Sequence, residues 1–321
     1  MLEMMLMRKG KDVITAKQLL VTGLDDFLTK TATYPVYGKD DQYLYLVNDS
    51  TGDVYRAPLV DLVNGTLNFT TIVKAGPVVG RLNSIAPYHA ASKKLMFIPA
   101  APTNRQLHTL SKSGVVAANA IDMMPGYQDS YGLGQAIVDD VFYYYGGYTQ
   151  QTPVPTMAVY RTTGGAGVLD STGPLPAPRA YACHTTDGVD IYTVGGLLTP
   201  SGGGYPLSNE LWRYSPLTHR WTKLASLPKT LRLSGACEII NRKLFIYGGL
   251  ETSNGLSPSQ TLYVYDIATD KWEALPLPEV GYRYGAMGFQ HNEKLYLLGG
   301  FLSPAPGTTG VRNGDLWELS V

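Results

Sequence analysis

Charged residues are scarce in this chain of 321 residues, and the shortage excludes two classes of partner. Asp, Glu, Lys and Arg make up 16% of the sequence, against about 25% in an average soluble domain. The 26 basic residues are balanced by 26 acidic ones. Binding to nucleic acid or to an anionic membrane depends on an excess of positive charge, which this chain does not have. We therefore expect no nucleic-acid partner.

Cysteine is almost absent as well. Cys183 and Cys237 are the two cysteines, too few for a disulfide framework or for a zinc site built from cysteine alone. Free cysteines in proteins are usually buried, so we expect two buried, reduced thiols.

Long apolar runs are missing too. No run approaches the roughly 20 residues that a membrane-spanning helix needs. The first residues, MLEMMLMRKGKD, carry their positive charges after the apolar stretch, which is the reverse of a signal peptide. The sequence predicts no membrane span, no signal peptide, and a location in the cytoplasm or inside a virion-like particle.

What the chain does contain favours strands and tight turns. Hydrophobic residues make up 44% of it, enough for a buried core, and there are 35 Gly, 21 Pro and 23 Tyr. Glycine and proline shape turns, while tyrosine is frequent in strands. An all-β domain is the predicted class.

A repeat of about 50 residues runs through the sequence. Gly-Gly pairs begin at Gly146, Gly195, Gly248 and Gly299, and each ends a short apolar stretch that follows a polar turn. Each stretch therefore reads as the second strand of a hairpin. The same turn-to-glycine distance finds two degenerate copies that end at Asn48 and Ala100. Six marks at 48, 100, 146, 195, 248 and 299 predict six propeller blades.

Two repeats continue with LWRYSPLTHRW (211–221) and LYVYDIATDKW (262–272). A Tyr and a Trp seven residues apart after a Gly pair closely resemble the Kelch-repeat β-propeller family. The resemblance covers the chain from about residue 130 to its end, and for the first two blades it is inferred. It implies an all-β, six-bladed Kelch-type propeller in which the repeated Gly, Tyr and Trp are structural.

The ring must be closed by the N-terminal segment. The chain stops at Val321, just after a stretch that matches a third strand, so the outer strand of the last blade is missing there. Aligning Val21 with the repeat tryptophans makes 17–24 the closing strand, paired with 315–319. The domain prediction is a propeller over 13–321 and a Met-rich tail over 1–12. That tail is a candidate docking segment, or else it lies on its own propeller.

Some Kelch propellers are enzymes, and this sequence contains a few of the residue types that their chemistry needs. Two enzymes of this architecture show which groups such chemistry needs. Galactose oxidase uses copper and a covalent Tyr–Cys link, and N-acetylneuraminate epimerase acts on a free sugar with an acid and a base. The residues that could be recruited are His89, His184, Cys183 and Glu238. No ligand spacing, serine nucleophile motif or phosphate loop accompanies them. We expect no enzyme activity, no metal and no cofactor.

The loops offer a binding surface instead. The loop after each second strand and the entry to each first strand should lie on one face, which gathers four long loops rich in Pro and Tyr and poor in charge. The candidate binding residues are Arg179, Tyr181, Arg232, Arg283, Tyr284, Tyr131, Tyr148, Tyr205 and Phe301. For the three arginines, an alternative is that they only hold neighbouring blades together.

Two functions remain open. The first is a non-catalytic protein-binding or assembly module, for example one component of a larger particle such as a viral tail. The second is a sugar-binding or sugar-modifying propeller with a closed pocket at the mouth, resembling the epimerase or the oxidase.

Overall fold

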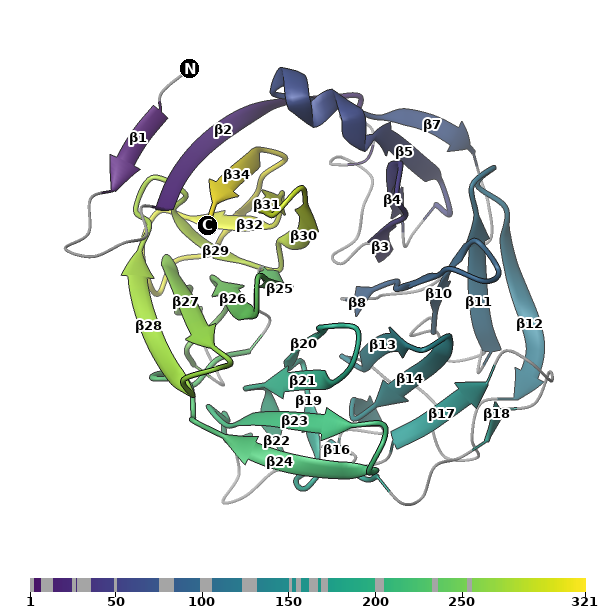
Figure 1. Ribbon diagram of the computed structural model, residues 1–321. Coiled ribbons are helices and arrows are strands. Elements are labelled where there is room, and N and C mark those ends of the chain that lie inside the picture. Colours follow the sequence, from purple (N-terminus) through teal and green to yellow (C-terminus); the bar gives the residue numbers. More distant parts are fainter. Residues whose placement is uncertain are drawn as a thin grey trace.

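The computed structural model describes residues 3–6, 14–24, 27, 36–48, 51–74, 84–98, 106–122, 132–149, 152–153, 157–161, 167–168, 173–199, 205–232, 236–252 and 256–321. Within them, β-strands dominate, and η1 (Leu59–Asn64) is a short 3-10 helix. Six sheets of four or more strands in this part of the chain surround a common centre, as Figure 1 shows. The prediction of an all-β propeller is confirmed.

The first three sheets, each given from the centre outward, follow the first half of the chain. The first contains β3 (Val36–Lys39), β4 (Tyr43–Val47), β5 (Val54–Pro58) and β7 (Thr70–Val73), with β8 (Ser84–Ile85) parallel to β3. The second contains β9 (Tyr88–His89), β10 (Lys94–Phe97), β11 (Gln106–Ser111) and β12 (Val116–Asp122). The third contains β13 (Gly134–Val138), β14 (Val141–Tyr145), β17 (Met157–Arg161) and β18 (Gly167–Val168).

The other three sheets complete the ring. The fourth contains β20 (Cys183–Thr186), β21 (Ile191–Val194), β23 (Leu211–Ser215) and β24 (Arg220–Leu224). The fifth contains β25 (Ala236–Ile240), β26 (Lys243–Tyr247), β27 (Thr261–Asp266) and β28 (Lys271–Pro276). The sixth contains β30 (Met287–His291), β31 (Lys294–Leu298), β34 (Leu316–Ser320), β2 (Ile14–Thr22) and β1 (Glu3–Leu6), and β6 (Thr66–Asn68) pairs with β2.

The turns that mark the repeat have the backbone that two-residue hairpins require. Both residues have positive φ in the turns Asp139-Asp140, Asn241-Arg242 and Asn292-Glu293, with values between 48° and 63°. This combination defines the type I′ turn, whose twist matches that of the paired strands. The polar pairs found in the sequence therefore do set the hairpins of the third, fifth and sixth sheets.

Side chains from neighbouring sheets pack against each other around the ring. Tyr214 and Tyr265, at the repeated third-strand position, are fully buried, and each contacts the repeat tryptophan of its own sheet with ring centroids 5.1 and 5.0 Å apart. Trp221 and Trp272 also donate their indole N–H groups to backbone carbonyls of the preceding connection. These aromatic residues are structural, as predicted.

The N-terminal strand closes the ring. Thr15 pairs with Ser320 and Leu19 with Leu316, so β2 is the outer neighbour of β34, and a buried cluster joins Leu19 and Leu316 to Leu44 of the first sheet. The predicted pairing with 315–319 is confirmed, although the strand starts earlier than residue 17. Its last residues, Leu20–Thr22, instead run parallel to β6.

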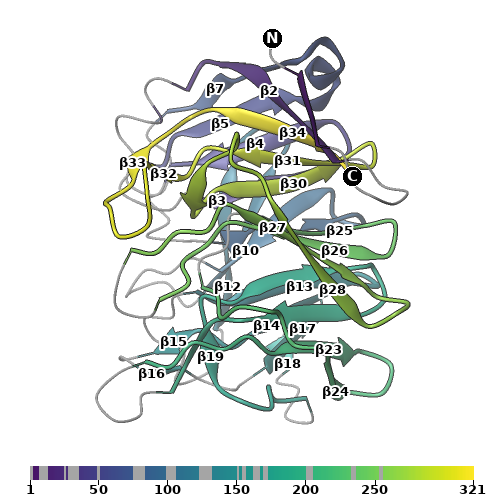
Figure 2. The ribbon, with the colours of Figure 1, turned by 90° about the vertical axis from the view of Figure 1, so that its left-hand side faces the viewer.

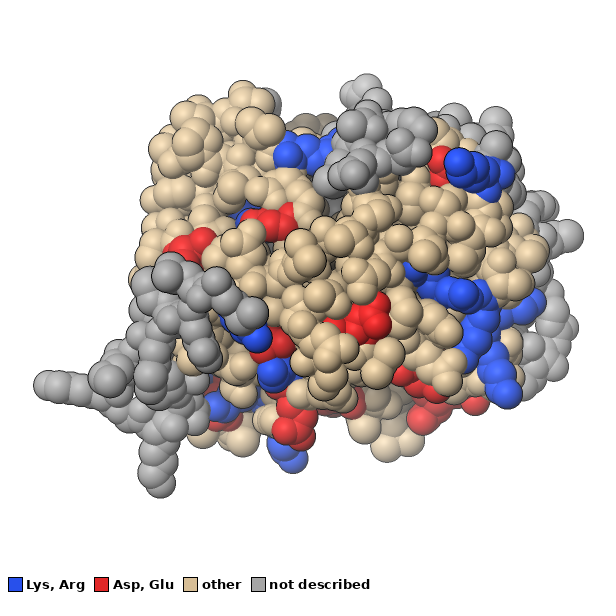
Figure 3. All heavy atoms as spheres, turned by 90° about the horizontal axis from the view of Figure 1, so that it is seen from above, with Lys and Arg blue, Asp and Glu red and all other residues tan. Residues whose placement is uncertain are grey.

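Part of the N-terminal tail also lies on the propeller. β1 pairs with the first residues of β2, Leu6 opposite Ile14 and Glu3 opposite Lys17. Of the two alternatives for the tail, this contact matches the one in which it lies on its own propeller. Figure 3 looks onto the rim formed by β2, η1 and β7, where Lys, Arg, Asp and Glu are scattered over a largely uncharged surface.

Three small sheets lie together on one face. They are β15 (Tyr148–Thr149) with β16 (Thr152–Pro153), β19 (Arg179–Ala180) with β22 (Leu197–Leu198), and β29 (Tyr282–Tyr284) with β32 (Phe301–Ser303) and β33 (Val311–Arg312). Figure 2 shows β15, β16, β19, β32 and β33 along its left-hand side. We call this side the loop face. Entry strands thus pair with the segments that follow the second strands, as the antiparallel connection requires.

The expectation of two free thiols is wrong. Cys183 and Cys237 form a disulfide, with their Cα atoms 5.9 Å apart, between the innermost strands of the fourth and fifth sheets. The separation of 54 residues is close to the 53 residues between Gly195 and Gly248, so the two cysteines occupy nearly corresponding positions in adjacent repeats. Neighbouring inner strands of a propeller bring such positions side by side.

None of the helices among the described residues has the length and hydropathy of a membrane-spanning segment.

Candidate functional site

Arg179 and Arg283 hold neighbouring sheets together. Both side chains are fully buried, with exposed fractions of 0%. The Arg283 guanidinium donates to both carboxylate oxygens of Asp315, at 2.6 and 2.9 Å, and to the backbone carbonyl of Gly299 in the sixth sheet. The Arg283 carbonyl in turn accepts the N–H of Gly249 in the fifth sheet. A guanidinium enclosed in this way presents no surface to a partner, so Arg179 and Arg283 do not fit the role of binding residues.

Arg179 repeats this arrangement two interfaces earlier, between the third and fourth sheets. Its guanidinium bonds Glu210 at 3.2 Å and the Gly195 carbonyl at 3.3 Å, and its own carbonyl accepts the N–H of Gly147. For Arg179 and Arg283, the alternative in which they join blades fits the structure.

Arg232 does not occupy the equivalent position. The N–H of Gly196 bonds the carbonyl of Leu231, not that of Arg232, so Leu231 stands where the buried arginines stand in the other two interfaces. The acid is replaced as well, because the residue corresponding to Glu210 and Asp315 is Thr261, whose carbonyl accepts the N–H of Gly248. Arg232 comes one residue later in the chain than the equivalent position. Its side chain is half-buried, and its Nε lies 3.0 Å from the Thr252 carbonyl. The repeat spacing that made it equivalent to Arg283 was misleading by one residue.

Three of the predicted aromatic residues do come together. Tyr284 and Leu250 form a small buried cluster, against which Tyr181, Leu256 and Phe301 pack while half-buried. We call these five residues the aromatic patch. Tyr284 and Phe301 stack with ring centroids 5.0 Å apart and planes inclined by 9°.

The aromatic patch lies on the loop face and is held in a fixed geometry. Residue 181 has a φ of +54°, and its N–H bonds the Gly132 carbonyl at 3.0 Å. The N–H of Gly307 bonds the carbonyl of Leu256 at 2.5 Å, which ties the long loop of the sixth sheet to that of the fifth. The guanidinium of Arg312 lies over the Phe301 ring, 5.6 Å from its centroid. A surface whose rings are held in this way would lose little entropy if a partner bound to it.

The remaining candidates are not part of the aromatic patch as described. Tyr205 is half-buried and follows β22 on the loop face. Tyr148 begins β15, and its backbone pairs with Pro153. Tyr131 and the degenerate mark Ala100 lie outside the described residues.

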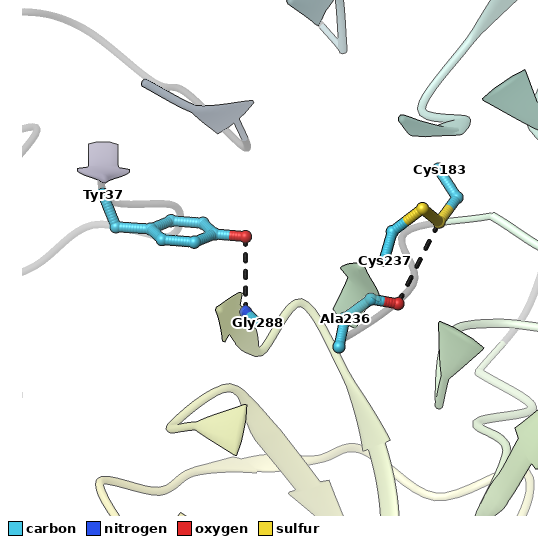
Figure 4. Close-up of a disulfide and its surroundings, with 5 residues drawn as sticks. All are labelled: Tyr37, Cys183, Ala236, Cys237 and Gly288. Carbon is cyan, nitrogen blue, oxygen red and sulfur yellow. Dashed lines mark hydrogen bonds between the residues drawn. A yellow bond between two sulfur atoms is a disulfide. The ribbon is translucent and has the colours of Figure 1, made fainter. Parts of the chain in front are cut away.

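A second group of polar side chains lies on the innermost strands. Tyr37 and Lys39 of β3, Glu238 of β25 and His291 of β30 are all half-buried, and β30 lies between the other two strands (Figure 1). The Tyr37 hydroxyl accepts the Gly288 N–H at 3.3 Å, and Figure 4 shows it directed toward the side on which the Cys183–Cys237 disulfide lies. These residues lie on the innermost strands of three sheets, close enough for their charges to act on one another.

Burial sets the protonation of this central group. It raises the pKa of Glu238 to about 8, and the positive charge of Lys39 offsets only part of the rise. It lowers the pKa of Lys39, and it lowers the pKa of His291, where Lys39 acts in the same direction. Near neutral pH, Glu238 is thus a carboxyl group that can be held protonated, which is the state a proton donor needs.

The other residues considered for chemistry are less available. The pKa of His184 is lowered to about 3 by burial and by Arg179, so its imidazole stays neutral, and Cys183 is bonded to Cys237. Among the described residues there is no group of three or more His, Cys, Asp and Glu that could hold a metal ion.

The raised pKa of Glu238 predicts a pH dependence of stability. The folded protein binds the Glu238 proton more tightly than the unfolded chain, so this contribution is complete below about pH 4.5 and is lost as the pH rises toward about 8. His184 acts in the opposite sense but only below about pH 6.5, where the unfolded chain takes up a proton that the folded protein does not. Between pH 6.5 and pH 8, the free energy of unfolding should fall by on the order of 1 kcal/mol.

Urea unfolding of the wild type and of Glu238→Gln at both pH values measures this change. The variant, which cannot ionise, should lose none of it. An equal loss in the two proteins would show that Glu238 does not titrate in this window.

Comparisons with known proteins agree on one family. The sequence matches the Attractin/LZTR1 β-propeller family over residues 137–305, more than half of the chain. It is 33% identical over 128 residues to Kelch-like protein 36 of Bos taurus, covering 40% of this chain and 20% of that protein. It is 31% identical over 126 residues to Kelch-like protein terF of Aspergillus terreus, covering 38% and 27%.

Two further comparisons concern sugar chemistry and the whole fold. N-acetylneuraminate epimerase 1 of Escherichia coli is 28% identical over 138 residues, 42% of this chain and 35% of that protein. The solved structure of YjhT superposes with a TM-score of 0.70 at 14% identity, covering 86% of this chain and 93% of the other. The matched segments span about a fifth to a third of the curated relatives. Together with the sheets and turns described above, these matches show that the chain belongs to the Kelch-repeat β-propeller family.

Proposed function

We propose that this chain is a protein-binding or assembly module that uses the aromatic patch as its contact surface. The six large sheets are taken as its six blades. One observation carries the proposal: Tyr181 of one repeat converges with Tyr284 and Phe301 of another in one partly exposed cluster on the loop face. Partly exposed aromatic residues on a rigid base are enriched at protein interfaces and often supply most of the binding energy.

The low charge of the chain supports the same function. A contact surface with few charges depends on buried apolar area and on polar backbone groups, so its affinity should change little with salt. The long loops around the aromatic patch provide such groups, and the hydrogen bond between Gly307 and Leu256 holds two of these loops in register.

Substitution of the half-buried members of the aromatic patch should weaken partner binding. We expect Phe301→Ala and Tyr181→Ala each to weaken the affinity for a co-purifying partner by about 30-fold, the effect of losing an interface residue worth about 2 kcal/mol. Leu217→Ala is the matched control, because Leu217 is 90% exposed in the turn between β23 and β24, away from the aromatic patch. Partners identified by mass spectrometry would be titrated against all three proteins.

Unchanged binding by both variants would contradict this prediction. If both variants at the aromatic patch bind the partner as the wild type does while thermal unfolding shows them intact, the contact surface lies elsewhere on the protein.

A second candidate function is sugar binding or sugar modification. The observation that favours it is the central group, in which the protonated Glu238 lies near Lys39 and Tyr37 on the innermost strands. The similarity to N-acetylneuraminate epimerase 1 points the same way. Nuclear magnetic resonance of N-acetylneuraminate anomers incubated with the protein tests it. Turnover by the wild type that is lost in Glu238→Gln would favour an enzymatic function over the proposed protein-binding function.

A further inference from the structure

A serine, a histidine and an aspartate meet at the turns of the second and third sheets. His89 ends β9, Ser92 lies in the turn that leads to β10, and Asp140 lies in the turn between β13 and β14. The Ser92 hydroxyl oxygen is 2.7 Å from Nδ1 of His89. On the opposite side of the imidazole, Nε2 of His89 is 3.5 Å from a carboxylate oxygen of Asp140. The sequence does not suggest this contact, because Asp140 comes from a different repeat.

Backbone geometry assigns the imidazole tautomer. The backbone N–H of Ser92 donates to Nδ1 of His89 at 3.1 Å, so in the neutral ring Nδ1 is the acceptor and the proton lies on Nε2. The Nε2–H then faces the Asp140 carboxylate. The single lone pair of Nδ1 thus faces both the N–H and the hydroxyl of Ser92. A hydroxyl that donates to this lone pair has the arrangement in which a histidine acts as a general base toward a serine.

Exposure separates the roles of the three residues. His89 is held in place, with 2% of its side chain exposed, whereas Asp140 is 54% exposed and Ser92 is exposed. Ser92 is therefore accessible from solvent, and the imidazole beside it is fixed.

The need to stabilise a turn does not account for all of this arrangement. In the first and fourth sheets, Asp40 and Asp187 accept the N–H of the residue three positions later, as His89 does. Those later residues are Tyr43 and Asp190, so the turn requires only the N–H. A hydroxyl on that later residue is not unusual, because Thr269 bonds Asp266 through both its N–H and its side chain. What the turn at His89 adds is a ring nitrogen as the acceptor and a carboxylate of the neighbouring sheet on the opposite side of the imidazole.

We propose that Ser92 is an activated nucleophile that reacts with activated acyl esters, with His89 as its base and Asp140 as the residue that orients His89. In the step, the Ser92 hydroxyl gives its proton to Nδ1 while its oxygen forms a bond to the acyl carbon. The bond from that carbon to the leaving alcohol breaks, and the alcohol takes the proton from Nδ1. Ser92 is left as an ester and His89 returns to its neutral form. This site is separate from the aromatic patch and from the central group.

Acetylation by p-nitrophenyl acetate, located by peptide mass spectrometry, tests the proposal on the full-length protein. We expect acetylated Ser92 in the wild type and none at this position in Ser92→Ala, which keeps the N–H that bonds His89. In His89→Gln, which lacks the base, Ser92 should be acetylated about 100-fold more slowly. This factor is the lower end of the range for general-base catalysis. Ser113→Ala is the control, since the Ser113 hydroxyl is hydrogen-bonded to another serine instead of a histidine.

Two results would overturn the proposal. One is acetylation of Ser92 at the same rate in His89→Gln as in the wild type. The other is acetylation of Ser92 no faster than that of Ser113 in the wild type. If His89→Gln fails to fold, as judged by circular dichroism, Asp140→Asn decides, because the exposed Asp140 can be changed without loss of packing. A folded Asp140→Asn protein that reacts at the wild-type rate excludes Asp140 as a positioning residue and with it the proposed triad.

Discussion

Replacing Arg283 with leucine should lower the free energy of unfolding by about 3 to 5 kcal/mol, the usual cost of removing one partner of a buried ion pair. The Asp315 carboxylate, whose side chain is 14% exposed, would lose two charge-assisted hydrogen bonds. The carbonyls of Gly299 and Val280 would lose their donor as well. Equilibrium unfolding in urea, followed by tryptophan fluorescence, measures the change.

The protein itself supplies the control for this experiment. The interface between the fourth and fifth sheets has Leu231 and Thr261 where the next interface has Arg283 and Asp315. The double variant Arg283→Leu with Asp315→Thr copies that apolar solution, so it should recover at least half of the stability that the single variant loses. A single variant within 1 kcal/mol of the wild type, or a double variant as unstable as the single one, would contradict the role of the ion pair in joining the sheets.

Removing the disulfide should have an effect of similar size. Cys183→Ala with Cys237→Ala is expected to lower the free energy of unfolding by about 4 kcal/mol, because the bond closes a loop of 54 residues and restricts the unfolded chain. Both cysteines are buried on innermost strands, so two alanines should disturb the folded ring little beyond the loss of their own packing. Urea unfolding with and without a reducing agent gives the same comparison in the wild type.

Counting thiols provides an independent check. The native wild-type protein should show no reactive thiol, and after reduction under denaturing conditions it should show two. Two thiols in the unreduced, denatured protein, with urea midpoints unaffected by reductant, would mean that the bond does not form. Cys183 and Cys237 would then be free thiols, as the composition led us to expect.

Short-range turn chemistry made most of the fold predictable. A polar pair at a fixed distance before each Gly-Gly step marks a hairpin, since few residue pairs accept two successive positive φ angles. Asn241-Arg242 and Asn292-Glu293 are found where this rule puts them. The closing strand followed from the same register, because Val21 aligns with the repeat tryptophans of the outer strands, and β2 does pair with β34.

The candidate binding surface was less predictable, because it depends on which repeat positions meet across sheets. The aromatic residues Tyr181, Tyr284 and Phe301 were found from their place on the loop face, but nothing in their spacing said that they converge. Arg232 was misplaced by one residue, since counting from a tryptophan cannot detect the shift that puts Leu231 under the Gly196 N–H. Leu250 and Leu256 were missed altogether, because an apolar residue in a loop has no chemical signature.

The sequence by itself determined the architecture: the period, the turns and the aromatic repeats are local features, and each constrains only the residues next to it in the chain. Tertiary structure alone decided which distant groups touch. Cys183 meets Cys237, Arg283 meets Asp315, and His89 meets Asp140, in each case across two different sheets. Such contacts follow from how far each sheet is rotated and shifted against the next. That depends on packing over the whole interface, and a shift of one residue changes every partner.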